Sequence, residues 1–508
     1  MTDNSTWSHG YPVGSAYPAS FHGFQSPAHL RMICALQGVV WEVDEHTPLS
    51  IAEVGCGSGY TAQMLAAGGP NWQVLGLDYN PAHIAQARSF AAAAGLGNLQ
   101  FLEADLAEMD EAACDRLPEF DLITVHGVWS WVADAVRDGL LRLIRRRLKP
   151  GGLALVTYNA LPGAAQSLGL SRLVRGCLDA ADGETGLAQA GDLVRRLVET
   201  EAVHLPNSAW RQMLMGQYAN VRPGYLLHEF STAHWRPSFQ ADVAQAMATA
   251  RCDFVGSATI DENFPQMSLS PPQIELWQAA PDAATRELIF DLCVPRPFRR
   301  DLYVRGLRRE AAELATDALW LAEADRTPGE RVLKTQLGEA RLPPAVVDSA
   351  MAALSCGPQQ VAQLRQLPGC GKVTPAELVA LLVGSGCAVP LWRQPGSGAD
   401  WTASVAAARR LNRIVGERLA PYGLAMGQFG LATPALGGGL RVTPQELAIA
   451  RSVADRQAAG QALTVEAIVG DLIPPGPRPP TEVLADMADL VQRTLVHKLP
   501  AWQTLGIV

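Results

Sequence analysis

The chain of 508 residues is about three times as long as a typical domain of about 150 residues, so two or three domains are expected. Hydrophobic residues make up 48% and charged residues 18% of it, which excludes extensive disorder and is typical of globular domains. The 50 acidic residues outnumber the 41 basic ones and give a net charge of −9, which argues against electrostatic capture of nucleic acid or of an anionic membrane.

The cysteines and the apolar segments indicate the cellular compartment and whether the chain binds a metal or spans a membrane. The nine cysteines are scattered without a C-x-x-C pair or a Cys/His cluster at metal-ligand spacing, so we expect reduced thiols in a cytoplasmic protein and no metal site. The first thirty residues contain no basic region followed by an apolar run, which disfavours a signal peptide. The longest uncharged runs, 378–392 and 422–440, are interrupted by Gly and Pro and match a membrane-spanning helix poorly.

Apolar segments that alternate with helical ones predict a parallel, doubly wound α/β sheet in the first part of the chain. The strands are expected, in chain order, at residues 49–54, 72–77, 99–102, 120–125 and 152–158. The helices between them are expected at 60–67, 80–94 and 137–148. Asn80-Pro81 provides an N-cap and a first-turn proline for the second of these helices.

A polar and mainly helical insertion is expected over residues 160–220. Its helices are predicted at 170–178 and 191–200, and further helices follow at 225–230 and 240–250. Two more strands are predicted at 252–260 and 299–305. We interpret these two strands as completing the sheet, so that the insertion lies within one domain.

Beyond about residue 310 the chain is predicted to be mainly helical. Thr374 and Thr443 each precede a proline and stand three residues before a glutamate, which is the pattern of a capping box at a helix start. The helix that begins after Thr374 is followed by a Gly-Ser-Gly turn and a short strand at 388–392. Helix, turn and strand in this order resemble a winged helix, and a plain helical bundle with one hairpin is the alternative.

The glycine-rich loop after the first strand, Glu53-Val-Gly-Cys-Gly-Ser-Gly59, indicates the kind of cofactor. It departs from the dinucleotide pattern G-x-G-x-x-G because Tyr60 stands at the last position, and no Lys-Ser or Lys-Thr pair follows as in a P-loop. Asp78 ends the second strand, where a carboxylate can accept both ribose hydroxyls of an adenosine. A ligand without phosphates needs only glycines that let the backbone approach it and an acid for the ribose.

This combination resembles motif I and its partner acid in class I S-adenosylmethionine-dependent methyltransferases. The resemblance implies a Rossmann-like sheet with S-adenosyl-L-methionine as the cofactor, and it places Asp105, at the end of the third strand, opposite the adenine amino group. The residues that it implies at the cofactor are Glu53, Gly55, Cys56, Gly57, Gly59, Asp78, Tyr79, Asp105, Leu106 and His126.

Further segments resemble the bacterial methyltransferases that carry a methyltransferase regulatory domain. The matching segments are His126-Gly-Val-Trp-Ser-Trp131, Val136-Arg-Asp138, Lys149-Pro-Gly-Gly152, Tyr158-Asn-Ala-Leu-Pro-Gly163, Tyr225-Leu-Leu-His-Glu-Phe230 and Pro297-Phe-Arg299. The similarity covers residues 10–305, although the N-terminal segments Tyr11–Pro18 and Phe21–Phe24 follow the family only in part. Members include protein lysine methyltransferases that modify outer-membrane proteins, whereas others have no established substrate.

The resemblance also suggests how the chain is divided. We expect a methyltransferase domain over residues 1–310, with the helical insertion at about 160–220 and the regulatory segment at about 221–310. Residues 311–508 form a mainly helical C-terminal domain in this prediction, with winged-helix character as one of its two interpretations.

Methyl transfer from a sulfonium is an in-line displacement that needs a lone pair on the acceptor and no metal ion. For a lysine acceptor with a pKa near 10.4, deprotonation at pH 7 costs about 4.6 kcal/mol. Burial of the amine, or a nearby group that takes its proton, lowers this cost. Side chains at strand ends and in the regulatory segment are the candidates for these tasks. The candidate catalytic residues are Tyr158, Asn159 and His126, and the candidate substrate-binding residues are Trp129, Trp131, His228 and Glu229.

Each of these candidates also has a structural alternative. His126 can contact the methionine part of the cofactor, and Trp129 and Trp131 can pack the start of a helix. His228 and Glu229 can form local hydrogen bonds within the regulatory segment.

Three functions are compatible with the sequence. The first is a protein lysine N-methyltransferase whose partner is a polypeptide such as an outer-membrane protein. The second is an O- or N-methyltransferase for a small metabolite, in which residues 311–508 serve for dimerisation or as a lid. The third is a non-catalytic cofactor-binding module that regulates a partner. No nucleic-acid partner and no membrane span are expected, and a homodimer is compatible with all three.

Overall fold

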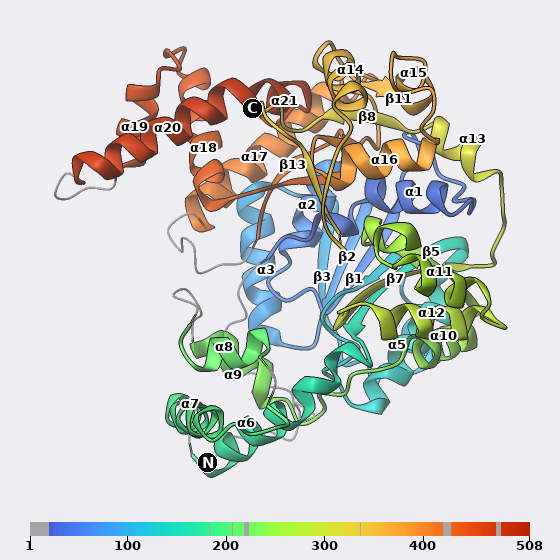
Figure 1. The fold of residues 1–508 in the computed structure, drawn as a ribbon. Coiled ribbons are helices and arrows are strands. Elements are labelled where there is room, and N and C mark those ends of the chain that lie inside the picture. The colour runs from blue at the N-terminus through green and yellow to red at the C-terminus, as the bar shows by residue number, and fades with distance from the viewer. Residues whose placement is uncertain are drawn as a thin grey trace.

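The computed structural model describes residues 20–181, 183–205, 207–217, 223–335, 337–419, 428–473 and 479–508, and a seven-stranded sheet lies at its centre (Figure 1). The strand order is β3-β2-β1-β4-β5-β7-β6. The strands are β1 (Ser50–Val54), β2 (Gln73–Asp78), β3 (Leu99–Glu103), β4 (Phe120–Val125), β5 (Leu148–Asn159), β6 (Cys252–Ser257) and β7 (Phe298–Arg305). β7 runs antiparallel to β5 and β6, and the other neighbouring strands are parallel. The predicted doubly wound sheet is confirmed, and β6 and β7 complete it as expected.

Both faces of the sheet are covered, because successive side chains of a strand point to opposite faces and both sets are apolar here. One face packs on α1 (Pro27–Leu36), α2 (Tyr60–Gly68) and α3 (Pro81–Ala94). The other face packs on α4 (Glu111–Asp115), α5 (Asp134–Arg147) and α10 (Gln240–Thr249). Strand β1 shows the alternation directly, since Ile51 belongs to the first core and Ala52 to the second.

The helical insertion has a small core of its own. It contains α6 (Leu168–Ala180), α7 (Gly183–Glu199) and α8 (Ala209–Leu214), which pack with α9 (Pro223–Ser231), the first helix of the regulatory segment. Figure 1 shows these four helices at the end of the molecule opposite the C-terminal region. The remaining helices of the regulatory segment are α11 (Pro271–Gln278) and α12 (Ala283–Cys293).

Residues beyond 310 are mainly helical, as predicted, but they also form three small sheets. β8, β11 and β12 make a three-stranded antiparallel sheet that contacts α14, α15 and α16, and the other two sheets are the hairpins β9–β10 and β13–β14. The strands are β8 (Trp320–Glu323), β9 (Val332–Thr335), β10 (Gly338–Arg341), β11 (Gln359–Gln360), β12 (Ala388–Pro390), β13 (Phe429–Thr433) and β14 (Gly438–Val442). The helices are α13 (Ala312–Asp317), α14 (Pro344–Ser355), α15 (Val361–Leu364), α16 (Pro375–Gly384), α17 (Trp401–Leu419), α18 (Pro444–Ala458), α19 (Val465–Leu472), α20 (Thr481–His497) and α21 (Leu499–Thr504).

Two details of this region were predicted from the sequence. Capping boxes begin α16 and α18, where Thr374 and Thr443 each exchange hydrogen bonds with the glutamate three residues later. The predicted short strand is β12, which pairs with β8. A three-stranded sheet beside three helices favours the winged-helix interpretation over a plain bundle with one hairpin.

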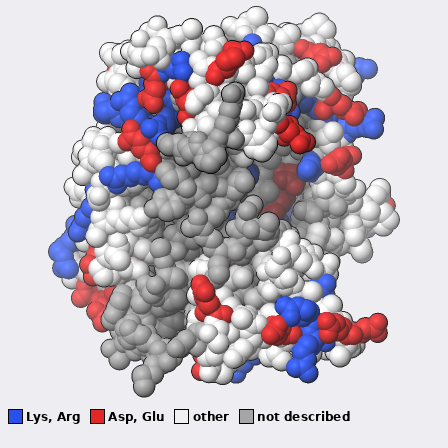
Figure 2. Space-filling view, turned by 90° about the vertical axis from the view of Figure 1, so that its left-hand side faces the viewer, with Lys and Arg blue, Asp and Glu red and all other residues white. Residues whose placement is uncertain are grey.

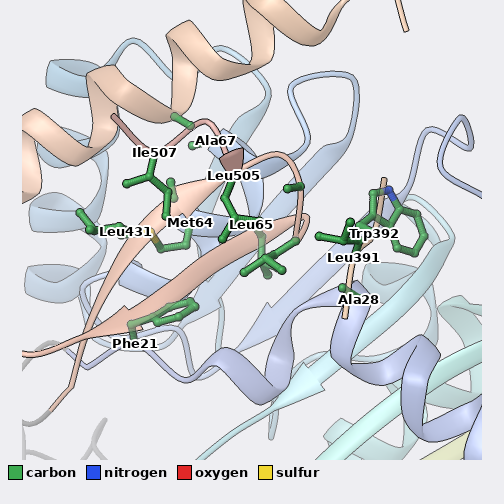
Figure 3. Packing of buried hydrophobic residues seen from close by; sticks show 14 of the residues in the cluster. Phe21, Ala28, Met64, Leu65, Ala67, Leu391, Trp392, Leu431, Leu505 and Ile507 are labelled. Carbon is green, nitrogen blue, oxygen red and sulfur yellow. The ribbon is translucent and has the colours of Figure 1, made fainter. Parts of the chain in front are cut away.

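One hydrophobic core extends from Phe21 to Val508 and includes residues on both sides of position 310. Figure 3 shows Met64 and Leu65 of α2 lying among Leu431 of β13, Leu505 and Ile507. All nine residues of α2 are buried. The division at residue 310 stays a prediction, because this core crosses it.

The surface carries charges of both signs. Figure 2 shows Lys and Arg lying among Asp and Glu on the coloured part of one face. In the part of the chain that the structure describes, no helix combines the length and the apolar character that crossing a membrane requires.

Candidate active site

A cavity lies at the carboxyl ends of β1, β2, β3 and β4, next to the point where the strand order reverses. Ligands of doubly wound sheets bind at this position. His228 and Glu229 of α9 line it from the regulatory segment, and His22 lines it from the N-terminal part of the chain. The empty space, mouth included, is about 1470 Å³.

Most of the predicted site residues meet at this cavity. Those that line it are Glu53, Gly55, Cys56, Gly57, Asp78, Tyr79, Asp105, Leu106, His126, Trp131, His228 and Glu229. The structure therefore brings the cofactor candidates together with part of the substrate candidates. Gly59, Trp129, Tyr158 and Asn159 do not line it.

The glycine loop joins β1 to α2 and forms one wall of the cavity. Gly57 has φ 54°, a left-handed conformation that favours glycine, and no atom lies within 4 Å of where its Cβ would be. A ligand can therefore approach the backbone closely at Gly57. Gly59 is the N-cap of α2 with φ 75°, and a Cβ there would lie 2.4 Å from the Phe101 ring. Gly59 thus serves packing behind the loop.

Three acidic side chains of the cavity accept hydrogen bonds from nearby backbone N–H groups. The Asp78 carboxylate accepts hydrogen bonds from the backbone N–H of Gly57 at 2.8 Å and of Asn80 at 2.9 Å, so it ties the glycine loop to the start of α3. The Glu53 carboxyl accepts a bond from the N–H of Ala62 at 2.7 Å, and burial raises the pKa of Glu53 to about 8. Asp105 accepts one from the N–H of Ala107 at 2.8 Å.

This lining does not suit a pyrophosphate. Among the described residues that line the cavity there is no Lys or Arg, and the Asp78 carboxylate already occupies the Gly57 N–H that would otherwise face an anion. The same lining suits an adenosyl ligand without phosphates that carries a positive charge. The glycine cradle and the strand-ending acids thus fit an adenosyl sulfonium.

Histidines are concentrated at the cavity, which His22, His83, His126, His228 and His234 line. Burial, and then the charge of Arg300 and Arg441, lowers the pKa of His22 to about 4, and burial together with His83 lowers the pKa of His228 to about 4. Burial lowers the pKa of His126 well below its usual value. These three imidazoles are therefore neutral at pH 7. No group of three His, Cys, Asp or Glu in the described ranges could hold a metal ion.

His126 is fixed by its neighbours. Its Nδ1 lies 2.9 Å from the Thr157 hydroxyl oxygen, which also accepts the N–H of Gly127 at 3.0 Å. The His22 ring lies against it, with 4.1 Å between ring centroids. The end of β4 is thus held in one conformation at the cavity wall.

Glu229 lies on the opposite side of the cavity from the sheet. Its side chain is buried, and this burial raises the pKa of Glu229 to about 7, while a hydrogen bond with Tyr225 acts in the other direction. Trp131 lines the same cavity, and its ring centroid lies 6.3 Å from that of Trp235. An acidic group and an aromatic wall are therefore present on the acceptor side.

Tyr158 and Asn159, predicted as catalytic residues, do not line the cavity. The Tyr158 hydroxyl donates to Asp301 at 2.6 Å, the side chain is 1% exposed, and Asp301 pairs with Arg299. Asn159 accepts a bond from the Trp235 indole N–H at 3.1 Å. Because side chains alternate along β5, Thr157 points to His126 while Tyr158 points into the core on the other face. Both predicted residues thus have structural partners away from the cavity.

Trp129, predicted as a wall of the acceptor site, is also a packing residue. It is 5% exposed and belongs to the core beneath α5, and its carbonyl accepts a bond from Arg137 at 2.8 Å. These contacts match the packing alternative stated for Trp129, and its role at the acceptor stays a prediction.

Three histidines of the cavity were missed. His83 follows the strand-ending Asp78 by five residues, and its Nδ1 lies 3.4 Å from the carboxylate, so its spacing was a usable signal. His22 lies in the Phe21–Phe24 segment, whereas the preceding Tyr11–Pro18 lies outside the described residues. His234 follows α9, and the neighbouring sequence contains no signal that would predict a site residue there.

Comparison with known families decides the identity of the chain. Residues 51–152 match the model of a methyltransferase domain, and residues 222–305 match that of a predicted methyltransferase regulatory domain. The chain is a class I S-adenosylmethionine-dependent methyltransferase. S-adenosylmethionine is accordingly the cofactor, and the chain is an enzyme.

Several proteins resemble this methyltransferase. The uncharacterized protein sll1526 of Synechocystis is 29% identical over 71% of this chain and 72% of its own length. Trans-aconitate 2-methyltransferase of Acidovorax is 32% identical over 27% of this chain and 48% of its own. The structure of PKMT2 from Rickettsia typhi in complex with AdoHcy superposes with a TM-score of 0.68 over 96% of this chain and 99% of that one. At 17% identity, this last likeness shows a shared fold.

Proposed function

We propose that this methyltransferase is a protein lysine N-methyltransferase. The observation that carries the proposal is the charge of the cavity. Glu53, Asp78, Asp105 and Glu229 line it, and no Lys or Arg does so in the described part of the chain. A cation that approaches buried carboxyl groups favours their ionised form. Such a lining suits a positively charged donor and a positively charged ammonium acceptor together.

The same charge disfavours the other acceptor class that the comparisons suggest. Trans-aconitate is a carboxylate substrate, and enzymes bind carboxylates with Arg or Lys, most strongly through bidentate pairs. This cavity offers no such side chain among its described residues. A tricarboxylate acceptor would therefore lie against acids without a counter-charge.

The cofactor roles are proposed for the residues on the sheet side. Glu53, Gly55, Cys56, Gly57, Asp78, Tyr79, Asp105, Leu106 and His126 would hold S-adenosylmethionine. Asp78 is assigned to the ribose hydroxyls and Asp105 to the adenine amino group. When bound, the cofactor supplies an electrophilic methyl group on a positively charged sulfur. The chain's part is to fix that methyl group in line with the acceptor.

The acceptor roles are proposed for the residues on the α9 side. Trp131 provides an aromatic wall, which attracts an ammonium group. His228 lies beside Glu229 at the cavity and shapes the same region. Glu229 would pair with the ammonium and accept its proton. The nitrogen lone pair would then be free for the methyl group that the bound cofactor supplies.

A cytoplasmic location belongs to the same proposal. All nine cysteines are free in the structure, as expected where thiols are kept reduced.

Labelled cofactor tests the proposal. The protein is incubated with methyl-labelled S-adenosylmethionine and a bacterial outer-membrane fraction, and labelled polypeptides are hydrolysed for amino-acid analysis. We expect the label in a polypeptide, as methylated lysine. Label that appears only in small molecules, or only on another side chain, contradicts the lysine assignment. A Gly57→Val variant, which fills the glycine cradle, is the inactive control.

A further inference from the structure

Tyr60 connects the cofactor cavity to the C-terminal region. It is the first residue of α2, follows Gly59 of the glycine loop directly, and lines the cavity while being 4% exposed. Its hydroxyl donates to the carbonyl of Gly430 in β13 at 3.1 Å and accepts the N–H of the same residue at 3.0 Å. Burial raises the pKa of Tyr60, so the hydroxyl keeps the proton that it donates.

The β13–β14 hairpin lies along the whole of α2. Tyr60, Met64 and Gly68 follow each other at intervals of four residues, so they share one face of this helix. A Cβ on Gly68 would lie 2.3 Å from the N atom of Gly438, and a Cβ on Gly439 would lie 3.3 Å from the Met64 sulfur. The hairpin therefore contacts α2 from its first residue to its last.

Phe21 brings a third segment to the same place. Its N–H donates to the carbonyl of Gln428 at 2.8 Å, and its ring meets that of Tyr60 edge to face with centroids 6.3 Å apart. A Cβ on Gly430 would lie 2.4 Å from the Phe21 ring, so glycine is required for this close approach. The next residue, His22, lines the cavity.

We propose that Tyr60 is a positioning residue for S-adenosylmethionine: through it, the β13–β14 hairpin holds the start of α2, and with it the glycine loop, in the geometry that binds the cofactor. Preorganised backbone loses less conformational entropy when a ligand binds. Residues 311–508 thereby contribute to the affinity for the cofactor without touching it. This inference concerns cofactor binding and is independent of the nature of the acceptor.

The test compares two variants that each lose two hydrogen bonds to the backbone of β13. Tyr60→Phe keeps the ring and removes both bonds to Gly430. Asn412→Leu removes the bonds of Asn412 in α17 to the N–H and carbonyl of Ala432, at 2.6 and 3.1 Å, away from the cavity. The dissociation constant of S-adenosylhomocysteine is measured by calorimetry well below the melting temperature of each variant. We expect an increase of about tenfold for Tyr60→Phe and no significant change for Asn412→Leu.

Two results would overturn the proposal. One is an unchanged affinity in Tyr60→Phe. The other is an equal loss of affinity in both variants, since that would follow general destabilisation of the hairpin. If Tyr60→Phe does not fold, Phe21→Leu replaces it, because it keeps the hydroxyl bonds and removes the ring that packs on Tyr60. We expect a weaker affinity for S-adenosylhomocysteine in Phe21→Leu as well, and an unchanged affinity in this variant counts against the proposal.

Discussion

Asp78 is the residue on which the proposed cofactor site depends most directly, because it both bonds to the glycine loop and lines the cavity. Asp78→Ala frees the N–H of Gly57 and removes the acceptor proposed for the ribose hydroxyls. We expect the dissociation constant of S-adenosylhomocysteine to rise by about 10- to 100-fold, measured by calorimetry. Asp121→Ala is the matched control, since Asp121 accepts the N–H of Ser50 in the same sheet but does not line the cavity. Equal affinity in the Asp78 variant and the wild type would refute the ribose assignment.

The raised pKa of Glu229 predicts how the methylation rate depends on pH. Burial raises the pKa of Glu229 to about 7, so the fraction of Glu229 in the carboxylate form, which the proposed proton transfer requires, increases as the pH rises through 7. The lowered pKa values of His22, His126 and His228 place their titration below this range. We expect Glu229→Gln to reduce the methylation rate roughly 100-fold at pH 7. The variant enzyme should recover activity only at high pH, where the amine loses its proton without help from a base.

The control for this prediction is a measurement of cofactor-product binding. The affinity for S-adenosylhomocysteine is expected to be the same in Glu229→Gln and in the wild type, and the exposed Glu119→Gln is expected to leave the rate profile unaltered. A Glu229→Gln enzyme with the pH profile of the wild type would show that another group takes the proton.

The residues of the cofactor side could be predicted from the sequence because they are contiguous with strand ends. Gly57, Asp78 and Asp105 each follow an apolar run whose end marks the edge of the sheet. The acceptor side could not be predicted in the same way. Whether Thr157 or Tyr158 contacts the cavity residue His126 depends on the face that each side chain presents, which the apolar run 152–158 does not reveal because both faces are buried.

At the scale of single elements, the capping box of α18 is a measurable contribution to stability. Thr443 accepts the N–H of Glu446 at 3.2 Å, and Glu446 accepts the N–H of Thr443 at 2.8 Å. Thr443→Ala should lower the free energy of unfolding by about 1 kcal/mol, seen as a lower melting temperature. Thr443→Ser should restore most of the loss. Equal melting temperatures for all three proteins would mean that tertiary packing alone holds this helix start.

Helices and strands with a clear pattern of apolar residues could be predicted from the sequence, and short elements without such a pattern could not. Most of the seven strands of the main sheet were expected because they are apolar runs between helices, whereas β7 carries Arg299, Arg300 and Asp301 among its apolar residues. The hairpin β13–β14 lies partly in the uncharged run 422–440, which carries no alternation and was considered only as a membrane span. The hairpin packs on α2, which is distant from it in the sequence, so no local sequence pattern predicts its two strands.

At the scale of the whole molecule, two buried acids lower stability as the pH rises. Burial raises the pKa of Glu53 to about 8 and that of Glu229 to about 7, above their values in an unfolded chain. Between each unfolded-state pKa and its raised value the folded state binds more protons than the unfolded state, so the contribution of these acids is lost as the pH rises through the raised values. The lowered pKa values of His22, His126 and His228 act in the opposite direction, but only as the pH falls below about 6.5. We therefore expect a lower melting temperature at pH 8.5 than at pH 7.

The variant Glu229→Gln isolates one of the two contributions. A shift from an ordinary value to about 7 corresponds to roughly 3 kcal/mol at high pH. The variant should therefore lose less stability than the wild type between pH 5.5 and 8.5, whereas Glu119→Gln should behave like the wild type. Parallel curves for all three proteins would mean that Glu229 is not the source of the effect.

The charge of the cavity also bears on how a catalytic cycle ends. Methyl transfer removes the positive charge from the sulfur, so the spent cofactor reaches the end of the reaction as a neutral thioether. The ammonium group of the methionine part keeps its charge, so the acidic side chains of the cavity lose only their attraction for the sulfur. We therefore expect the spent cofactor to bind this lining less tightly than the fresh donor does.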